Sequence, residues 1–120
     1  MTTILRRFSL LSVLVLALAL PALAQQAQPI TFDDLIALER VSDPQISPDA
    51  RWVVYVIDHY EKANNSRSSD LWLVPLAGGE PRPLTRSGKR DSRARWSPDG
   101  SRIAFLSNRD GKWQIWTIPT

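Results

Sequence analysis

One short pattern occurs twice in this 120-residue chain and restricts its possible folds more than any other feature. Ser-Pro-Asp-Ala occupies residues 47–50, and Ser-Pro-Asp-Gly occupies residues 97–100. Each copy is followed by an apolar run, at residues 52–57 in the first copy and 103–106 in the second. A repeat of about 50 residues is typical of a protein built from stacked copies of one small structural unit.

The repeated pattern predicts a turn followed by a β-strand. Proline presets φ for the second position of a type I turn, aspartate suits the third, and glycine can take a positive φ at the exit. Ala50 stands where the second copy has Gly100, so the same geometry would cost up to about 1 kcal/mol there. The runs that follow are rich in β-branched and aromatic residues at successive positions, which predicts strands buried on both faces.

The repeat predicts four strands in the first unit and three in the second. The predicted strands are 44–47, 51–58, 70–75 and 82–85, then 94–97, 102–107 and 113–119, with a polar hairpin loop at 59–69. Four-stranded units of this length are the blades of β-propellers, which contain about 4 to 8 of them. We therefore predict an all-β fold. It is an incomplete β-propeller domain at residues 44–120, with one complete blade at about 44–85 and a partial blade at about 94–120.

The first 24 residues have the pattern of a secretory signal peptide. Arg6 and Arg7 precede an apolar run at residues 8–20. Ala24 ends a cleavage motif with small residues, and we expect cleavage after it. The apolar run is shorter than the roughly 20 residues that span a bilayer. The sequence thus predicts a signal peptide at 1–24 and export to the bacterial periplasm or medium, with no membrane contact after cleavage.

A linker with one short helix is predicted at residues 25–43. Thr31 has the side chain of a helix N-cap, and Asp34 stands three residues later, where it can complete a capping box. Phe32 and Leu35 share one face of this helix. We expect that apolar face to dock on another part of the protein.

Charge and composition exclude several classes of function. The formal net charge is +3, and two of the positive charges belong to the predicted signal peptide. The remainder is near neutral, which argues against nucleic-acid binding. Cysteine is absent, and the single histidine, His59, cannot assemble a metal site alone. We expect no cofactor and no metal.

Three segments, 31–49, 70–85 and 95–107, together resemble the N-terminal region of exported bacterial peptidases. The similar family is the prolyl oligopeptidase family, in its acylaminoacyl peptidase and dipeptidyl aminopeptidase branch, with WD40-like propeller repeats. The resemblance implies a propeller that gates peptide access to a C-terminal α/β-hydrolase domain of the same polypeptide. The blade motif also resembles TolB, so the alternative is a non-enzymatic periplasmic propeller that binds protein partners. A first blade that begins near Pro44 favours the peptidase.

No catalytic residue is predicted within these 120 residues. A serine hydrolase of the implied kind needs a Gly-x-Ser-x-Gly elbow, followed by an acid and a histidine. The chain contains no such elbow. We expect a serine peptidase as the parent protein and no activity from the chain alone. The implied partners are peptide substrates and the hydrolase domain, and the oligomeric state is left open.

A cluster of basic residues between the two predicted blades is the best candidate for binding. We single out Lys89, Arg90 and Arg93 as substrate-channel candidates. A segment that joins two blades can face the central channel, where positive charge would attract the acidic ends of peptides. The alternative, which the sequence favours, is that the same residues simply form a solvated surface.

Overall fold

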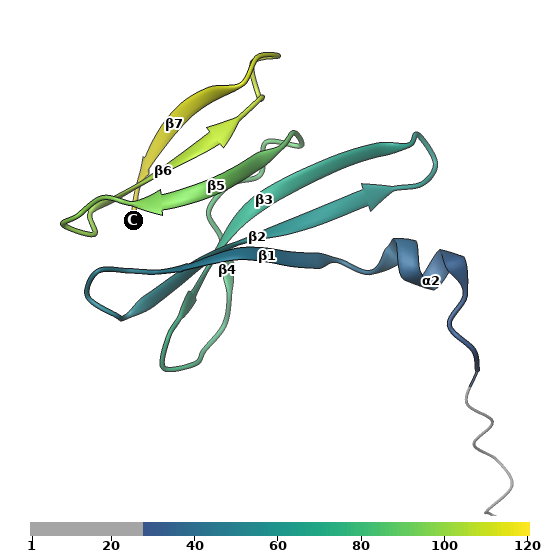
Figure 1. The fold of residues 1–120 in the computed structure, drawn as a ribbon, viewed down its shortest axis with the longest axis horizontal. Coiled ribbons are helices and arrows are strands. Elements are labelled where there is room, and N and C mark those ends of the chain that lie inside the picture. The colour runs from purple at the N-terminus through teal and green to yellow at the C-terminus, as the bar shows by residue number, and fades with distance from the viewer. Residues whose placement is uncertain (1–27) are drawn as a thin grey trace, which may run out of the picture. The chain divides into compact units, whose positions relative to one another are not determined.

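The computed structural model describes residues 28–120, so the predicted signal peptide at 1–24 lies outside the described residues. Residues Thr31–Thr120 form one compact unit. Within it, one short helix precedes seven strands in two antiparallel sheets (Figure 1). No helix in the described part of the chain has the length and apolar character needed to cross a membrane.

The two sheets correspond to the two predicted blades, and the partial propeller-like fold is confirmed. The first sheet has four strands in the order β1-β2-β3-β4, and the second has three in the order β5-β6-β7. The strands are β1 (Arg40–Ile46), β2 (Trp52–Glu61), β3 (Ser66–Pro75), β4 (Arg82–Pro83), β5 (Asp91–Trp96), β6 (Arg102–Ser107) and β7 (Gln114–Pro119).

Strand β6 has the predicted bounds, whereas the hairpin of β2 and β3 is longer than predicted. The predicted loop at 59–69 is wrong, because the ladder continues to the pair Glu61 and Ser66. The additional polar residues satisfy their backbone groups by pairing with each other, so they extend two strands instead of forming a loop. Strand β1 also starts early, since Arg40 already pairs with Asp58.

Strand β4 is shorter than predicted, because the chain leaves the ladder after Pro83. The amides of Leu84 and Thr85 both donate to the carbonyl of Leu71, at 2.7 and 3.3 Å. The Thr85 hydroxyl in turn accepts a hydrogen bond from the Leu71 amide at 3.0 Å. These bonds turn the chain away from the first sheet before β5 begins.

Helix α2 (Phe32–Ala37) starts with the predicted cap. The Thr31 hydroxyl accepts a hydrogen bond from the Asp34 amide at 3.2 Å, and the Asp34 carboxylate accepts one from the Thr31 amide at 2.9 Å. These two bonds form a capping box, and the hydrogen bonds from Thr31 lower the pKa of Asp34. The predicted docking of the apolar face is not observed in the described residues, because no residue of α2 is buried and Phe32 is 68% exposed.

The core lies between the two sheets. We call the two sheet faces that meet there the inner faces. Strands β2 and β3 contribute Val54, Val56, Leu71 and Leu73, and the second sheet contributes Ala94, Ile103 and Phe105, all of them buried. Burial of both faces of each sheet was predicted for blades with a neighbour on each side, and in the described residues each sheet has a neighbour on one face only. On the outer face of the first sheet, Val53, Tyr55 and Val74 are only half-buried, because no other sheet of the described chain covers them.

The turn of the repeat is held by the same hydrogen bonds in both copies. In the second copy, the Asp99 carboxylate accepts bonds from the Ser97 hydroxyl at 2.6 Å and the Ser101 amide at 3.0 Å. In the first copy, Ala50 adopts a φ of 55°, close to the 71° of Gly100, so the left-handed geometry is kept without glycine. The hydrogen bonds that Asp99 accepts lower its pKa from 3.8 to about 2, and the bond from the Ser97 hydroxyl has the largest effect.

Replacing Ser97 by alanine should therefore raise the pKa of Asp99 toward 3.8. In the wild type, the bonds to ionised Asp99 stabilise the fold above pH 3.8, and that contribution is lost as the pH falls through about 2. The measurement is an NMR titration of the Asp99 carboxyl carbon in wild type and Ser97→Ala. An unchanged titration curve in the variant would contradict the assigned cause.

Asp91 joins the two sheets through its backbone carbonyl, and its buried carboxylate ties β5 to the residues at the end of β6. Asp91, at the start of β5, is fully buried and accepts hydrogen bonds from Ser87 and Ser107 and from the Arg109 guanidinium, the last at 3.1 Å. The Asp91 carbonyl accepts a bond from the Ser69 hydroxyl of β3 at 2.8 Å. This network fixes the start of the second sheet against the first.

Removing this carboxylate should destabilise the fold strongly. Asp91→Ala leaves Arg109 and two hydroxyls without their partner, and loss of one member of a buried pair costs about 3 kcal/mol. Asp110→Ala, in an exposed turn, is the matched control and should change the free energy of unfolding by less than about 0.5 kcal/mol. Urea unfolding at one protein concentration measures both. Equal losses in the two variants would refute the role of Asp91.

Candidate functional site

An open groove of about 510 Å³ runs between the first strands of the two sheets, β1 and β5. We call it the arginine groove. Its lining residues are Ser42, Asp43, Val56, Asp58, Arg67, Ser69, Arg90, Ser92, Arg93 and Arg95. Strands β1 and β5 supply five of these residues, β2 and β3 supply four, and Arg90 immediately precedes β5. The groove therefore requires both sheets.

A β-bulge at the same repeat position in each sheet shapes the arginine groove. The pairing register breaks between Ser42 and Gln45 in β1, and between Ser92 and Arg95 in β5. Inside these breaks, Asp43 has a φ of 48° and Arg93 a φ of 54°. Such values are strained for residues other than glycine, and aspartate tolerates them better than arginine does. Bulges redirect side chains, and here both redirected side chains line the groove.

Two ion pairs neutralise half of the arginines in the groove. The Arg95 guanidinium donates to the Asp43 carboxylate at 3.0 and 3.2 Å, which links β5 to β1. The Arg67 guanidinium donates to Asp58 at 2.9 and 3.1 Å across the hairpin. Since the groove has no further carboxylate, Arg90 and Arg93 leave it with a net positive charge.

The side chains of Arg90 and Arg93 are available to a ligand. Arg93 is exposed, and its side chain makes no hydrogen bond or ion pair within residues 28–120. The Arg90 guanidinium lies 5.8 Å from the centre of the Trp113 ring, and the Arg90 amide donates to the Asn108 side chain at 2.8 Å. Guanidinium groups bind carboxylates and phosphates with two parallel hydrogen bonds. The groove is thus suited to binding an anion, and its lining contains no histidine that could act as a base.

The structure brings together two of the three predicted site residues. Arg90 and Arg93 line the groove, whereas Lys89 does not. The Lys89 carbonyl instead accepts a hydrogen bond from the Ser69 amide at 2.9 Å, which joins the linker to β3. Sequence reasoning missed the pair of Asp58 and Arg67. Arg67 lay in the predicted loop, where no cross-strand partner is expected. Asp43 and Arg93 occupy the same position of the repeat, and this was the one sequence feature that could have indicated the bulges.

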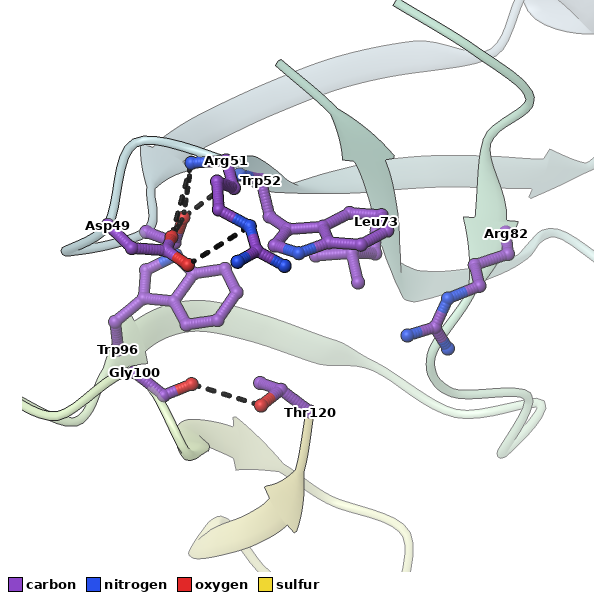
Figure 2. Close-up of a pocket in the computed structure, with 9 residues that line it drawn as sticks. Asp49, Arg51, Trp52, Leu73, Arg82, Trp96, Gly100 and Thr120 are labelled. Carbon is purple, nitrogen blue, oxygen red and sulfur yellow. Dashed lines mark hydrogen bonds and ion pairs between the residues drawn. The ribbon is translucent and has the colours of Figure 1, made fainter. Parts of the chain in front are cut away.

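A second pocket, of about 250 Å³, lies beside the repeated turns (Figure 2). Its polar groups already have structural partners. The Asp49 carboxylate accepts a bond from the Arg51 amide at 3.1 Å, and the Thr120 hydroxyl donates to the Gly100 carbonyl at 3.0 Å. The Arg82 guanidinium lies 5.9 Å from the centre of the Trp52 ring. We therefore place the candidate site in the arginine groove.

His59 lies in β2, between two carboxylates. Its Nδ1 is 3.3 Å from Glu39, and its Nε2 is 3.9 Å from Asp70. Burial, and next the negative charge of Asp91, raise the pKa of Asp70. Among residues 28–120, no cluster of three or more histidine, cysteine or acidic residues could hold a metal ion.

Curated proteins with sequences similar to this chain include two named peptidases. The uncharacterised peptidase YuxL of Bacillus subtilis is 39% identical over 82 residues, which are 68% of this chain and 12% of YuxL. Dipeptidyl-peptidase 5 of Porphyromonas gingivalis is 31% identical over 86 residues, 72% of this chain and 13% of that protein. The homologues of this chain are peptidases. No family model matches the chain.

A solved peptidase structure has the same fold in the matching region. The acylaminoacyl peptidase of Pyrococcus horikoshii superposes with a TM-score of 0.58 and 26% identity, over 71% of this chain and 13% of that one. The resemblance to peptidases of this branch is confirmed. The chain spans about an eighth of the length of these peptidase homologues.

The strained φ of Arg93 gives a direct test of the groove's geometry. Arg93→Gly should be more stable than Arg93→Ala by about 1 kcal/mol, because only glycine adopts a positive φ without strain. Ser92 does not have a positive φ, so the order of stability should be reversed there. Ser92→Ala should be more stable than Ser92→Gly. Urea unfolding of the four variants measures both differences. An Arg93→Ala variant at least as stable as Arg93→Gly would contradict the positive φ at the bulge.

Proposed function

We propose that this chain is part of the propeller of an exported serine peptidase and helps to gate the entry of peptides to an α/β-hydrolase domain of the same polypeptide. The observation that carries the proposal is its 39% identity to a peptidase over 68% of the chain. The fold supports it, because the matching region of a solved acylaminoacyl peptidase superposes on these sheets. The apolar run at 8–20 behind Arg6 and Arg7 supports export.

The position of the arginine groove supports a role in peptide entry. Propeller blades surround a central channel, and β1 and β5 are the first strands of two successive blades. Their shared edge carries the groove, so a ring built in the usual way would turn Arg90 and Arg93 toward the channel. Positive charge in a channel attracts anions and raises their local concentration. Peptides with a free terminal carboxylate would be drawn in.

The chemistry of hydrolysis belongs to the proposed hydrolase domain. The described residues supply binding and exclusion, since the groove offers cationic donors and no base. A narrow channel would exclude folded proteins and admit extended peptides. The peptidase homologues favour this function over that of a non-enzymatic propeller.

The test uses the full-length polypeptide that carries this chain, assayed on one peptide with a free C-terminal carboxylate and on the same peptide with a C-terminal amide. The double variant Arg90→Gln/Arg93→Gln should lower kcat/KM about 3- to 10-fold for the carboxylate, because two exposed ion pairs are lost. The amide should be hydrolysed as before.

Arg86→Gln is the matched control, because Arg86 is exposed but does not line the groove. It should change neither rate. Loss of both rates on mutating the serine of a Gly-x-Ser-x-Gly elbow downstream would support the serine peptidase. A polypeptide without such an elbow would refute the enzymatic part of the proposal, and equal rates in all variants would refute the role of the groove.

A further inference from the structure

The arginine groove carries an excess of two positive charges, because four arginines and two carboxylates line it. It lies between β1 and β5, which belong to the two sheets that pack on each other. The core residue Val56 is part of its lining, so the groove adjoins the interface between the sheets and not an outer face. A ligand that complements the groove is therefore expected to bring two negative charges.

The two ion pairs inside the groove show how it holds carboxylates. The Arg95 guanidinium donates to both oxygens of Asp43, at 3.0 and 3.2 Å. The Arg67 guanidinium donates through two of its nitrogens to one oxygen of Asp58, at 2.9 and 3.1 Å. In each case one guanidinium holds one carboxylate by two contacts. The two remaining guanidiniums thus offer places for two further carboxylates.

The bulge in β5 brings these two guanidiniums, of Arg90 and Arg93, to the same groove. Residues three apart in a regular strand point to opposite faces of the sheet. The register break between Ser92 and Arg95 interrupts this alternation, and both arginines line the groove. A ligand whose two carboxylates are a few atoms apart can therefore contact both.

Arg90 is held in place before any ligand arrives. Its amide donates to the Asn108 side chain at 2.8 Å, and its carbonyl accepts a bond from the Asn108 amide at 3.3 Å. Its guanidinium lies 5.8 Å from the centre of the Trp113 ring. A donor that is already fixed loses little conformational freedom on binding. Arg90 thus supplies a fixed cationic donor beside the exposed side chain of Arg93.

We propose that the arginine groove selects peptides whose C-terminal residue is acidic, with one guanidinium on the terminal carboxylate and the other on the side-chain carboxylate. The inference rests on the proposed function and names the substrate class of the same site. A C-terminal glutamate or aspartate brings two carboxylates within a few atoms of each other. A peptide that ends in a neutral residue leaves one guanidinium without a partner. Exposed ion pairs are weak, so we expect a selectivity of about 2- to 5-fold.

The test uses the full-length polypeptide that carries this chain and four peptides that differ only at the C-terminus. They end in glutamate or glutamine, each as the free acid and as the amide. Among the free acids, the glutamate peptide should have a kcat/KM about 2- to 5-fold above that of the glutamine peptide. The difference should lie in KM with kcat unchanged, because this contact is equally strong in the ground state and the transition state.

Single variants assign the two contacts. Of Arg90→Gln and Arg93→Gln, one should lose the preference for glutamate over glutamine and the other the preference for acid over amide. The double variant should lose both preferences, and Arg86→Gln, which is exposed outside the groove, should keep both. The glutamine amide carries neither carboxylate, so its unchanged hydrolysis in every variant shows that folding and chemistry are intact.

The outcomes separate this inference from the proposed function. Equal kcat/KM for the two free acids, with acid still preferred over amide, would overturn the inference and leave the proposed function standing. Equal rates for acid and amide would refute both. A glutamate preference that persists in the double variant would overturn the inference, because other residues would then set it. Single variants that each lose both preferences would overturn the binding of one carboxylate per guanidinium.

Discussion

Burial of apolar area between the two sheets is the interaction on which the rest of the structure depends. A single four-stranded sheet has two faces and cannot cover either of them by itself. Here the inner faces cover each other, and fully buried Leu71 and Ile103 lie at their contact. The chain gains its core only through the stacking of one repeat on the next.

The arginine groove is a consequence of the same stacking. Its walls are β1 from one sheet and β5 from the other, and the ion pair of Arg95 with Asp43 spans them. Asp91 holds β5 in place through Arg109 and through the bond from Ser69. A change at the core would therefore reach the groove, and Val56 belongs to both the core and the lining.

Features with local causes could be predicted from the sequence. The repeated turn, strand β6 and the Thr31 capping box each depend on residues close together in the chain, and the structure has all three. The resemblance to peptidases could also be recognised from the sequence, because it is carried by the segments that contain the capping box and the repeated turn. The extended hairpin was missed because polar residues at 59–69 look like a loop unless the pairing register is known.

The groove could be predicted only in part. Composition alone pointed to Arg90 and Arg93, but a charged run does not reveal which side chains a bulge will redirect. Lys89 was grouped with them because it is adjacent in sequence, whereas the structure uses its backbone to join β3. The ion pair of Arg67 with Asp58 depends on a cross-strand register that no local pattern encodes.

Hydrogen exchange of the Phe105→Ala variant tests most directly whether the two sheets depend on each other. Phe105 belongs to β6 and is 2% exposed in the shared core, so its truncation should remove packing from both sheets. We expect this dependence to speed amide exchange in β2 and β3 as well as in β6. Faster exchange confined to β5, β6 and β7, with β2 and β3 protected as in the wild type, would contradict it.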